Sequence, residues 1–467
     1  MQVQTVDQTN FSIRKILLYT AITGGFVLLF VFPSIPSLLY RRSLGTAGYV
    51  FSLSIAYGRV LNTLVLVALL GLVGRTVLSA VFGFSTVDPP EIPDDAELPS
   101  VSVVIPAYNE AEVLPSTIEA CKDLDYPAEK LEIILCYEAA STDRTEEIVE
   151  AAAAEDIRFK AVRRDEPGGG KAKATNYALQ HVTGDIIASI DADHEFAPDA
   201  IRRAVAWFLD DEDIWCVKGR CYGRNPTDSL LALHATVERH IVEKADIFGR
   251  EVVDGFTFFG GGQAFFRTEV FEDLGLFDEH VLVEDIDMSS RIHGHGKEIQ
   301  IDPDIITYEE NPATFAAWWS QRKRWARGWM QVARRYFTTK DFGPRFPLRK
   351  RADALYTFTY AIVPALLVLA LPMAIISFYA PVDVGTYVPL DGMLWTAISV
   401  APLFTSLLIF IQDWQRDHAH HPYEFVAAFT LWPYLALQTI VFVTAMIEEF
   451  VLNEPSVYVT TSRSGAS

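Results

Sequence analysis

Asp185-Ile-Ile-Ala-Ser-Ile-Asp191-Ala-Asp193 is the stretch that predicts the fold of the central part of this chain. Its short run of β-branched and apolar residues is typical of a strand buried on both faces, as in a parallel sheet. Two similar runs lie upstream, at residues 101–105 and 131–136, with helical stretches between the runs. Strands that alternate with helices predict an α/β domain with a doubly wound sheet, whose ligands bind at the carboxyl ends of the strands.

Asp191 and Asp193 follow this strand directly, at the edge of the sheet where ligands are expected. Side chains two positions apart in an extended segment point the same way, so both carboxylates could hold one hard cation that bridges a diphosphate. An Asp-x-Asp pair is common in proteins without a metal. The metal hypothesis therefore depends on the motifs around the pair.

A glycine-rich turn lies upstream, in Pro167-Gly-Gly-Gly-Lys171-Ala-Lys173. It leads into a predicted helix, so backbone N–H groups and either lysine could contact phosphate oxygens. The segment is not a Walker sequence, because neither Ser nor Thr follows the first lysine. Taken alone, a loop with solvated lysines is the simpler interpretation.

Glu284 and Asp285 precede a stretch that predicts the start of a helix. Carboxylates at that position could cap the helix or favour its dipole without taking part in catalysis. Alternatively, Asp285 could be a general base that removes the proton of an acceptor hydroxyl. The spacing of these residues leaves both interpretations open.

Residues 313–337 combine four tryptophans with six basic side chains. On a helix, one stripe is aromatic and apolar, and most cations are expected on the opposite face. The helix could lie in a membrane interface, or its tryptophans could stack on a sugar beside arginines that bind pyrophosphate. Residues 228–250 predict a second helix of this kind, with a weaker signal.

Five apolar stretches are long enough, or nearly so, to cross about 30 Å of hydrocarbon; they are residues 16–40, 60–84, 354–382, 392–412 and 425–447. We expect the first to be an anchor rather than a cleaved signal peptide. Basic residues before the first and third stretches favour a cytoplasmic central domain, whereas three arginines in the first connecting loop favour the opposite orientation.

The net charge and the cysteine spacing argue against nucleic-acid-binding, disulfide-linked and zinc-binding proteins. A net charge of −21 argues against a nucleic-acid-binding protein. The acidic composition, with Arg favoured over Lys, is consistent with a salt-adapted organism. The four cysteines form no C-x-x-C pair and have no accompanying His spacing, so the sequence predicts neither a disulfide framework nor a zinc site.

Taken in order, these motifs resemble those of the processive family 2 glycosyltransferases, which include the cellulose, hyaluronan, chitin and poly-N-acetylglucosamine synthases. The likeness covers the central region and extends to the apolar stretches on both sides. The matching segments are Pro106-Ala-Tyr-Asn-Glu110, Ser141-Thr-Asp143, Gly169-Gly-Lys171, Asp191-Ala-Asp193, Val283-Glu-Asp285 and Gln321-Arg-Lys-Arg-Trp325.

The resemblance implies a GT-A catalytic domain inserted between N- and C-terminal transmembrane helices of a multi-pass protein of the cell (plasma) membrane. The implied boundaries are an N-terminal membrane region at 1–86, a cytoplasmic GT-A domain at 87–312, interfacial helices with a Q-x-x-R-W motif at 313–353 and a C-terminal membrane region at 354–467. Two transmembrane helices are expected in the first region, and about three apolar segments with a short tail in the last.

The same resemblance implies a role for each matching residue. Residues expected to contact the nucleotide are Tyr108, Glu110, Glu138, Lys171 and Lys173; Asp193 is expected to bind Mg²⁺ or Mn²⁺, with Asp191 supporting either the ribose or the metal. Asp285 resembles the catalytic base, with Glu284 beside it. Residues expected to line the acceptor and pyrophosphate sites are Gly261, Gly262, Gln321, Arg324 and Trp325. The family usually has Asp-Asp-Gly-Ser where this chain has Glu138-Ala-Ala-Ser141, which leaves the nucleotide preference open.

The function implied is inverting transfer from a nucleotide-sugar, with a UDP-sugar as the expected donor, to a growing β-linked polysaccharide that the protein also translocates. Two alternatives stay open: a single transfer to a lipid or lipid-linked acceptor, and a membrane sensor that binds the nucleotide without turnover. The segment Thr461-Ser-Arg463 faintly resembles the gating segment of such synthases, a role that requires a cytoplasmic tail. The donor sugar, the linkage and the oligomeric state are not predicted.

Overall fold

The computed structural model describes residues 46–84, 88–166, 168–339, 343, 345–359, 363–367, 369–370, 385–416 and 418–455. The chain divides into two compact units: unit 1 comprises Met1–Gln4, Leu78–Phe358 and Thr405–Ser467, and unit 2 comprises Thr5–Val77 and Thr359–Phe404. The expected first span at 16–40, Pro167 of the glycine-rich turn and the segment at 461–463 lie outside the described residues.

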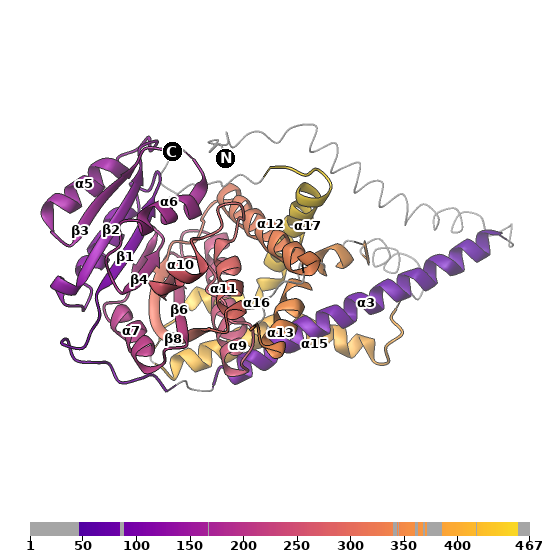
Figure 1. Ribbon diagram of the computed structural model, residues 1–467. Coiled ribbons are helices and arrows are strands. Elements are labelled where there is room, and N and C mark those ends of the chain that lie inside the picture. The colour runs from indigo at the N-terminus through magenta and orange to yellow at the C-terminus, as the bar shows by residue number, and fades with distance from the viewer. Residues whose placement is uncertain are drawn as a thin grey trace. The chain divides into compact units, whose positions relative to one another are not determined.

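Within the described residues, unit 1 is built on a sheet with the strand order β3-β2-β1-β4-β7-β6-β8-β5 (Figure 1). The strands are β1 (Val101–Ala107), β2 (Leu131–Glu138), β3 (Phe159–Arg164), β4 (Ile186–Ile190), β5 (His194–Phe196), β6 (Ile214–Gly223), β7 (Gln263–Arg267) and β8 (Glu298–Glu309). β3, β2, β1 and β4 are parallel, β6 is parallel to β8, and β7 runs antiparallel to β4 and β6. The predicted α/β class is confirmed, and the three predicted strands correspond to β1, β2 and β4, whereas β3 was not predicted.

Burial on both faces explains why these strands have continuous apolar runs. Val103 and Val104 are neighbours in β1, yet they belong to two separate core clusters, because successive side chains point to opposite faces of a strand. The helices between β1 and Thr359 are α4 (Leu114–Lys122), α5 (Thr145–Glu155), α6 (Gly170–Leu179), α7 (Ala200–Asp210), α8 (Leu230–His240), the π-helix Ile241–Phe248, α9 (Gly249–Val252), α10 (Glu269–Leu274), α11 (Glu284–Gly294), α12 (Phe315–Thr339) and α13 (Leu348–Thr359), besides a 3-10 turn at Ala128–Lys130.

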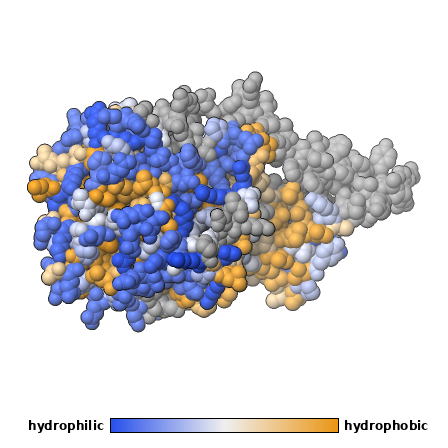
Figure 2. Space-filling model, in the orientation of Figure 1, coloured by the Kyte–Doolittle hydropathy of each residue, from blue (hydrophilic) through white to orange (hydrophobic). Residues whose placement is uncertain are grey.

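Three helices among the described residues are long and apolar enough to cross a membrane: α3 (Thr46–Phe82), α15 (Asp391–Trp414) and α17 (Leu431–Phe450). Hydrophobic side chains gather on the surface of α3 and α15, whereas the surface over the sheet is largely hydrophilic (Figure 2). α3 and α15 coincide with the apolar stretches predicted at 60–84 and 392–412. Of the stretch predicted at 354–382, residues 354–359 are helical and belong to α13, 363–367 and 369–370 are also helical, and most of the remainder lies outside the described residues.

The apolar stretch at 425–447 is interrupted, contrary to the prediction of one continuous segment. α16 (Pro422–Phe429) ends at Thr430, and α17 begins at Leu431. The cause is Pro433, which lacks the N–H that would bond the carbonyl of Phe429 and whose ring clashes with that carbonyl. Both helices belong to unit 1, where α16 packs against α8 and α17 packs against α12.

A closed ring of buried polar side chains joins α15 and α16 to the sheet. Arg220 on β6 donates to both carboxylate oxygens of Asp413, at 2.5 and 2.7 Å. His420 lies 2.8 Å from Asp413 and 2.9 Å from Glu424. His240 on α8 completes the ring, 2.9 Å from Glu424 and 3.3 Å from Arg220. Every charge in this ring therefore has an opposite charge beside it, as burial requires.

Candidate active site

Asp191 and Asp193 lie in the tight connection between β4 and β5, at the carboxyl end of a central strand. The backbone N–H of Asp191 donates to the carbonyl of Gly262 at 2.9 Å, which joins this connection to the loop before β7. The ammonium of Lys171 lies 2.5 Å from a carboxylate oxygen of Asp191. The acidic pair and the first lysine of the glycine-rich segment therefore belong to one site.

The glycine-rich turn delivers Lys171 to this site. Gly168, Gly169 and Gly170 all have positive φ angles, of 80°, 102° and 76°, which residues with a side chain rarely adopt. α6 starts at Gly170, so Lys171 lies in its first turn. The ammonium of Lys171 also lies 3.8 Å from a carboxylate oxygen of Glu284, so one cation lies between acids from β4 and α11.

Asp285 lies in the first turn of α11 and faces a pocket. Other residues that line the pocket are Lys171, Thr175, Ser189, Phe259, Gly261, Gln263, Ala264, Phe277 and Glu284. Val283 occupies the N-cap position of α11, and Asp285 Oδ1 accepts the backbone N–H of Ile286 in the first turn at 2.9 Å. Burial, together with the neighbouring Glu284, raises the pKa of Asp285 to about 7, against the opposing effect of Lys171. A carboxyl group with this pKa can accept a proton near neutral pH.

Two glycines let the backbone approach the acidic side chains closely. Gly261 and Gly262 both have φ of +63°. A Cβ at Gly261 would lie 3.3 Å from Asp285 Oδ2, and one at Gly262 would lie 2.5 Å from His194 Nε2. A side chain at Gly262 would therefore displace His194, and one at Gly261 would crowd the carboxylate that faces the pocket.

Asp193 is the first member of a chain of charged contacts that the sequence analysis missed. His194 Nδ1 lies 2.9 Å from Asp193, and His194 Nε2 lies 3.1 Å from Glu309 at the end of β8. Glu309 pairs in turn with Arg239 of α8. Burial alone would lower the pKa of His194, but Asp193 and the other polar neighbours raise it well above its usual value. His194 follows the Asp-x-Asp pair directly, a signal that could have been used; Glu309 and Arg239 gave none.

Trp325 of the Q-x-x-R-W segment contacts Arg239, the last residue in this series of charged contacts. The guanidinium of Arg239 lies 5.7 Å from the centre of the Trp325 ring, and that of Arg322 lies 4.3 Å from it, both within cation–π range. Gln321 accepts a hydrogen bond from Arg322 at 3.2 Å. Arg324 lies on the same helix, α12, and the residues that line the pocket that Asp285 faces do not include Arg324 or Gln321.

Two of the six predicted cations of α12 are buried rather than exposed to solvent. Arg322 and Arg327 are buried, because Glu238 of α8 and Glu449 of α17 pair with them at 2.7 and 3.0 Å. The stretch at 228–250 is helical, as expected, but it is also packed into unit 1, and Lys244 within it is fully buried. Both segments are packed parts of unit 1.

The remaining predicted residues form a second group at the ends of β1, β2 and β3. Tyr108 and Glu110 follow β1, and the backbone N–H of Glu110 donates to Thr145 at 2.9 Å. Glu138 ends β2, where it is buried and pairs with Arg164, a residue that the sequence analysis missed. Burial raises the pKa of Glu138, and Arg164 opposes that rise.

Lys173 connects the two groups through α6. Its ammonium lies 3.1 Å from Glu166, while Lys171, two residues earlier, lies against Asp191. Arg164 donates to the carbonyl of Gly168 at 2.8 Å, which fixes the turn before α6. The carboxylate of Glu138, which lies at the position of the family's Asp-Asp-Gly-Ser motif, is thus paired with Arg164 rather than left open to a nucleobase.

Comparison with known proteins agrees with this architecture. Residues 102–275 match the family described as Glycosyl transferase family 2. Over 267 residues the chain is 33% identical to the probable glycosyltransferase YdaM of Bacillus subtilis, an alignment that covers 56% of this chain and 62% of YdaM. It is 29% identical to the beta-monoglucosyldiacylglycerol synthase of Nostoc (70% and 68% covered) and 28% identical to the poly-beta-1,6-N-acetyl-D-glucosamine synthase of Staphylococcus aureus (54% and 60% covered).

Among solved structures, the mannosyltransferase PcManGT from Pyrobaculum calidifontis, in complex with GDP-Man and Mn²⁺, superposes with a TM-score of 0.57. The sequences are 22% identical, and the match covers 84% of this chain and 99% of that structure. At this identity the likeness shows the fold, and it confirms the predicted GT-A architecture. Residues 102–275 are therefore a family 2 glycosyl transferase domain, built on the GT-A fold.

Proposed function

We propose that this chain is a multi-pass, inverting glycosyltransferase of the cell membrane, which transfers a sugar from a nucleotide-sugar on the cytoplasmic side to an acceptor hydroxyl. The observation that carries the proposal is the pocket in which the buried Asp285 lies close to Glu284 and Lys171. Lys171 also contacts Asp191, so a potential base and a potential diphosphate site share one lysine.

The residues at the end of β4 fit a divalent metal with its diphosphate. Asp191 and Asp193 offer carboxylate oxygens, the ligands that Mg²⁺ and Mn²⁺ prefer. Such an ion supplies charge neutralisation to the departing diphosphate. Lys171, in the first turn of α6, adds a positive charge beside Asp191. His194 holds Asp193 in place through a 2.9 Å contact.

The nucleoside part of the donor, expected to be uridine, is assigned to the second group, around Tyr108, Glu110 and Glu138. These residues end neighbouring strands, next to the turn that precedes α6. Because Arg164 forms an ion pair with Glu138, we expect both side chains to take part in recognising the nucleobase.

Asp285 is assigned the role of the base. Its buried carboxylate would take the proton of the acceptor hydroxyl as that oxygen attacks the anomeric carbon from the face opposite the diphosphate. A single displacement with one base inverts the anomeric centre, so an α-linked donor gives a β-linked product. Gly261 and Gly262 leave space for the acceptor, and Trp325 offers an aromatic face on which its sugar could stack.

For the acceptor, we propose a growing glycan that is elongated and carried between the membrane helices; one relative is named as a poly-beta-1,6-N-acetyl-D-glucosamine synthase. The Q-x-x-R-W residues Gln321, Arg324 and Trp325 on α12 support this, because α12 packs directly on α17. A second candidate is a single transfer to a lipid. The longer alignment, 70% of this chain, with the relative named for glucosyldiacylglycerol synthesis favours it.

The experiment that tests this proposal incubates the purified, detergent-solubilised protein with labelled UDP-sugars and Mg²⁺ or Mn²⁺. Products are sized on a gel and partitioned into organic solvent. High-molecular-weight material that a glycosidase degrades would support a polymer synthase. A small, solvent-soluble product that requires added diacylglycerol would support the single transfer. Donor binding without any product would contradict both and support a nucleotide sensor.

A further inference from the structure

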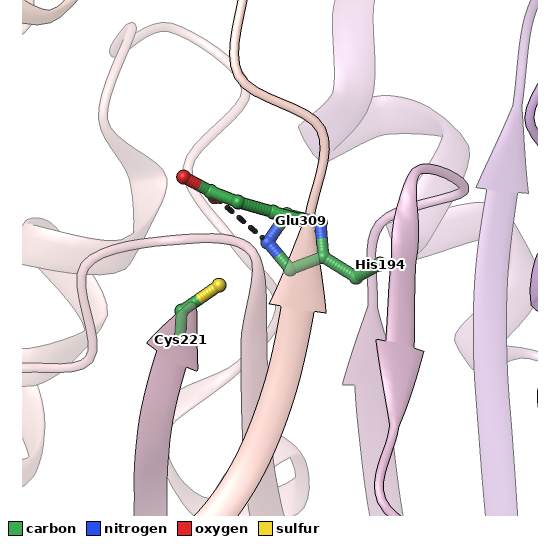
Figure 3. A group of neighbouring side chains, drawn as sticks. All are labelled: His194, Cys221 and Glu309. Carbon is green, nitrogen blue, oxygen red and sulfur yellow. Dashed lines mark ion pairs between the residues drawn. The ribbon is translucent and has the colours of Figure 1, made fainter. Parts of the chain in front are cut away.

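Three buried side chains meet beside Asp193: His194, Cys221 and Glu309 (Figure 3). The register of neighbouring strands brings them together. His194 is the direct partner of Glu309 across β5 and β8, and Cys221 on β6 is paired with Thr307, two residues before Glu309 on β8. Because side chains two positions apart share a face, all three point to the same side of the sheet.

Their potential ligand atoms lie close together and are shielded from solvent. One nitrogen of His194, one carboxylate oxygen of Glu309 and the sulfur of Cys221 all lie within 4.8 Å of one another. The three residues are 4%, 6% and 2% exposed, respectively. Gly262 lies over His194 Nε2 without a side chain, since a Cβ there would approach that nitrogen to 2.5 Å. The cluster is therefore compact and enclosed.

We propose that His194, Cys221 and Glu309 form a second metal site, which takes a borderline-soft divalent ion of the Zn²⁺ class. Imidazole nitrogen, thiolate sulfur and carboxylate oxygen are the three ligand types that Zn²⁺ takes in proteins. The hard cations expected at Asp191 and Asp193 prefer oxygen alone, so the sulfur separates the two sites chemically. A water molecule completes a tetrahedral set.

The surroundings of His194 match those of a metal-bound histidine. Its Nε2 faces Glu309, and its Nδ1 lies 2.9 Å from Asp193. A histidine ligand typically donates its second ring N–H to a carboxylate, which fixes the tautomer and the orientation of the ring. An ion at this site therefore holds His194 in contact with Asp193, and so positions one of the carboxylates assigned to the donor's metal.

The charges balance when the ion binds. Zn²⁺ binds histidine through an unprotonated ring nitrogen and cysteine as a thiolate, so the thiol proton of Cys221 leaves to solvent when the ion binds. The two positive charges of the ion are then matched by the thiolate of Cys221 and the carboxylate of Glu309. Arg239 keeps its pairing with Glu309. No uncompensated charge is left buried, which would otherwise be costly.

X-ray absorption at the zinc edge tests this site. The full-length, detergent-solubilised protein is treated with a chelator, then given one equivalent of Zn²⁺ in excess Mg²⁺, which fills sites made of oxygen alone. We expect one sulfur at about 2.3 Å and nitrogen or oxygen ligands at about 2.0–2.1 Å. A spectrum from the wild-type protein with only nitrogen and oxygen ligands would overturn the proposal, whether or not any variant folds.

Two variants assign the sulfur. Cys221→Ser should lose the sulfur contribution, whereas Cys216→Ser, a matched change on the same strand, should keep it. Cys216 is fully buried but belongs to the apolar core rather than to the cluster. A sulfur signal that survives in Cys221→Ser, or disappears in Cys216→Ser, would also overturn the assignment. The test does not depend on sugar transfer, so it can fail or succeed independently of the proposed function.

Discussion

Asp285→Asn tests the proposed base with almost no change in the shape of the side chain. Asparagine cannot accept the proton of the acceptor hydroxyl, and the loss of a general base typically costs about 10²–10⁴-fold in rate. We therefore expect kcat to fall by about that factor. Donor binding should survive, because the substitution leaves unchanged the contact between Lys171 and Asp191, the residues assigned to the diphosphate and its metal.

The pKa of Asp285 gives this prediction a pH dependence. Burial and Glu284 raise the pKa from 3.8 to about 7, so the base is protonated, and inactive, below that pH. The wild-type kcat/KM should rise about tenfold per pH unit below about pH 7 and level off above it. The residual rate of Asp285→Asn should lack this rise.

The same pKa predicts a gain in stability in the inactive variant. A folded-state pKa above the unfolded value means that the folded protein binds the proton more tightly, so the wild type loses stability as pH rises from about 4 to about 7. The difference between 3.8 and about 7 corresponds to about 4 kcal/mol. This value is an upper limit to the folding stability that Asp285→Asn recovers above pH 7, because the asparagine amide carries no charge that burial would destabilise.

The assay combines release of the nucleoside diphosphate with thermal unfolding, both across pH 5–9. Asp287→Asn is the matched control: the same substitution on the same helix, at a residue that pairs with Arg291 and Arg335 instead of facing the pocket. We expect the control to retain turnover. Near-normal turnover by Asp285→Asn, or an equal loss in both variants, would refute the assignment of Asp285 as the base.

Three further substitutions test the metal ligand, the lysine beside the base and the buried polar ring. Asp193→Ala should weaken Mg²⁺-dependent donor binding in calorimetric titrations, and unchanged affinity would contradict its metal role. Lys171→Met should lower kcat and shift the break in the pH–rate profile upward, because Lys171 opposes the rise in the pKa of Asp285; a break at the wild-type pH would show that the two groups do not interact. Asp413→Ala leaves Arg220 buried without its partner, so thermal unfolding should show a loss of about 3–5 kcal/mol. A loss below about 1 kcal/mol, typical of exposed pairs, would contradict the buried ring.

Local sequence patterns predicted the elements on which the site is built. The strand that precedes Asp191, the glycine turn before Lys171 and the long helix that carries Trp325 all have signals within a few residues: an apolar run, a cluster of glycines, a helical stripe. The structure places Asp191, Lys171, Glu284 and Asp285 together because the ends of β4, α6 and α11 converge.

The polar partners of these residues could not be predicted, because the order of strands in the sheet brings together residues that are far apart in the sequence. β5, β6 and β8 are neighbours in the sheet, although Cys221 and Glu309 lie 27 and 115 positions after His194 in the sequence. The cysteine spacing therefore gave no indication of a metal site. The burial of Arg322 was equally hidden, because its partner Glu238 lies on another helix. The break before α17, by contrast, was readable from Pro433.

The anomeric configuration of the product tests the central claim most directly. Once a donor is identified, proton NMR of the newly formed glycosidic linkage distinguishes α from β. The account predicts a β-linkage from an α-linked nucleotide-sugar, since Asp285 is the one base of a single displacement. An α-linkage would require retention through two displacements, and it would contradict both the role of Asp285 and the inverting mechanism.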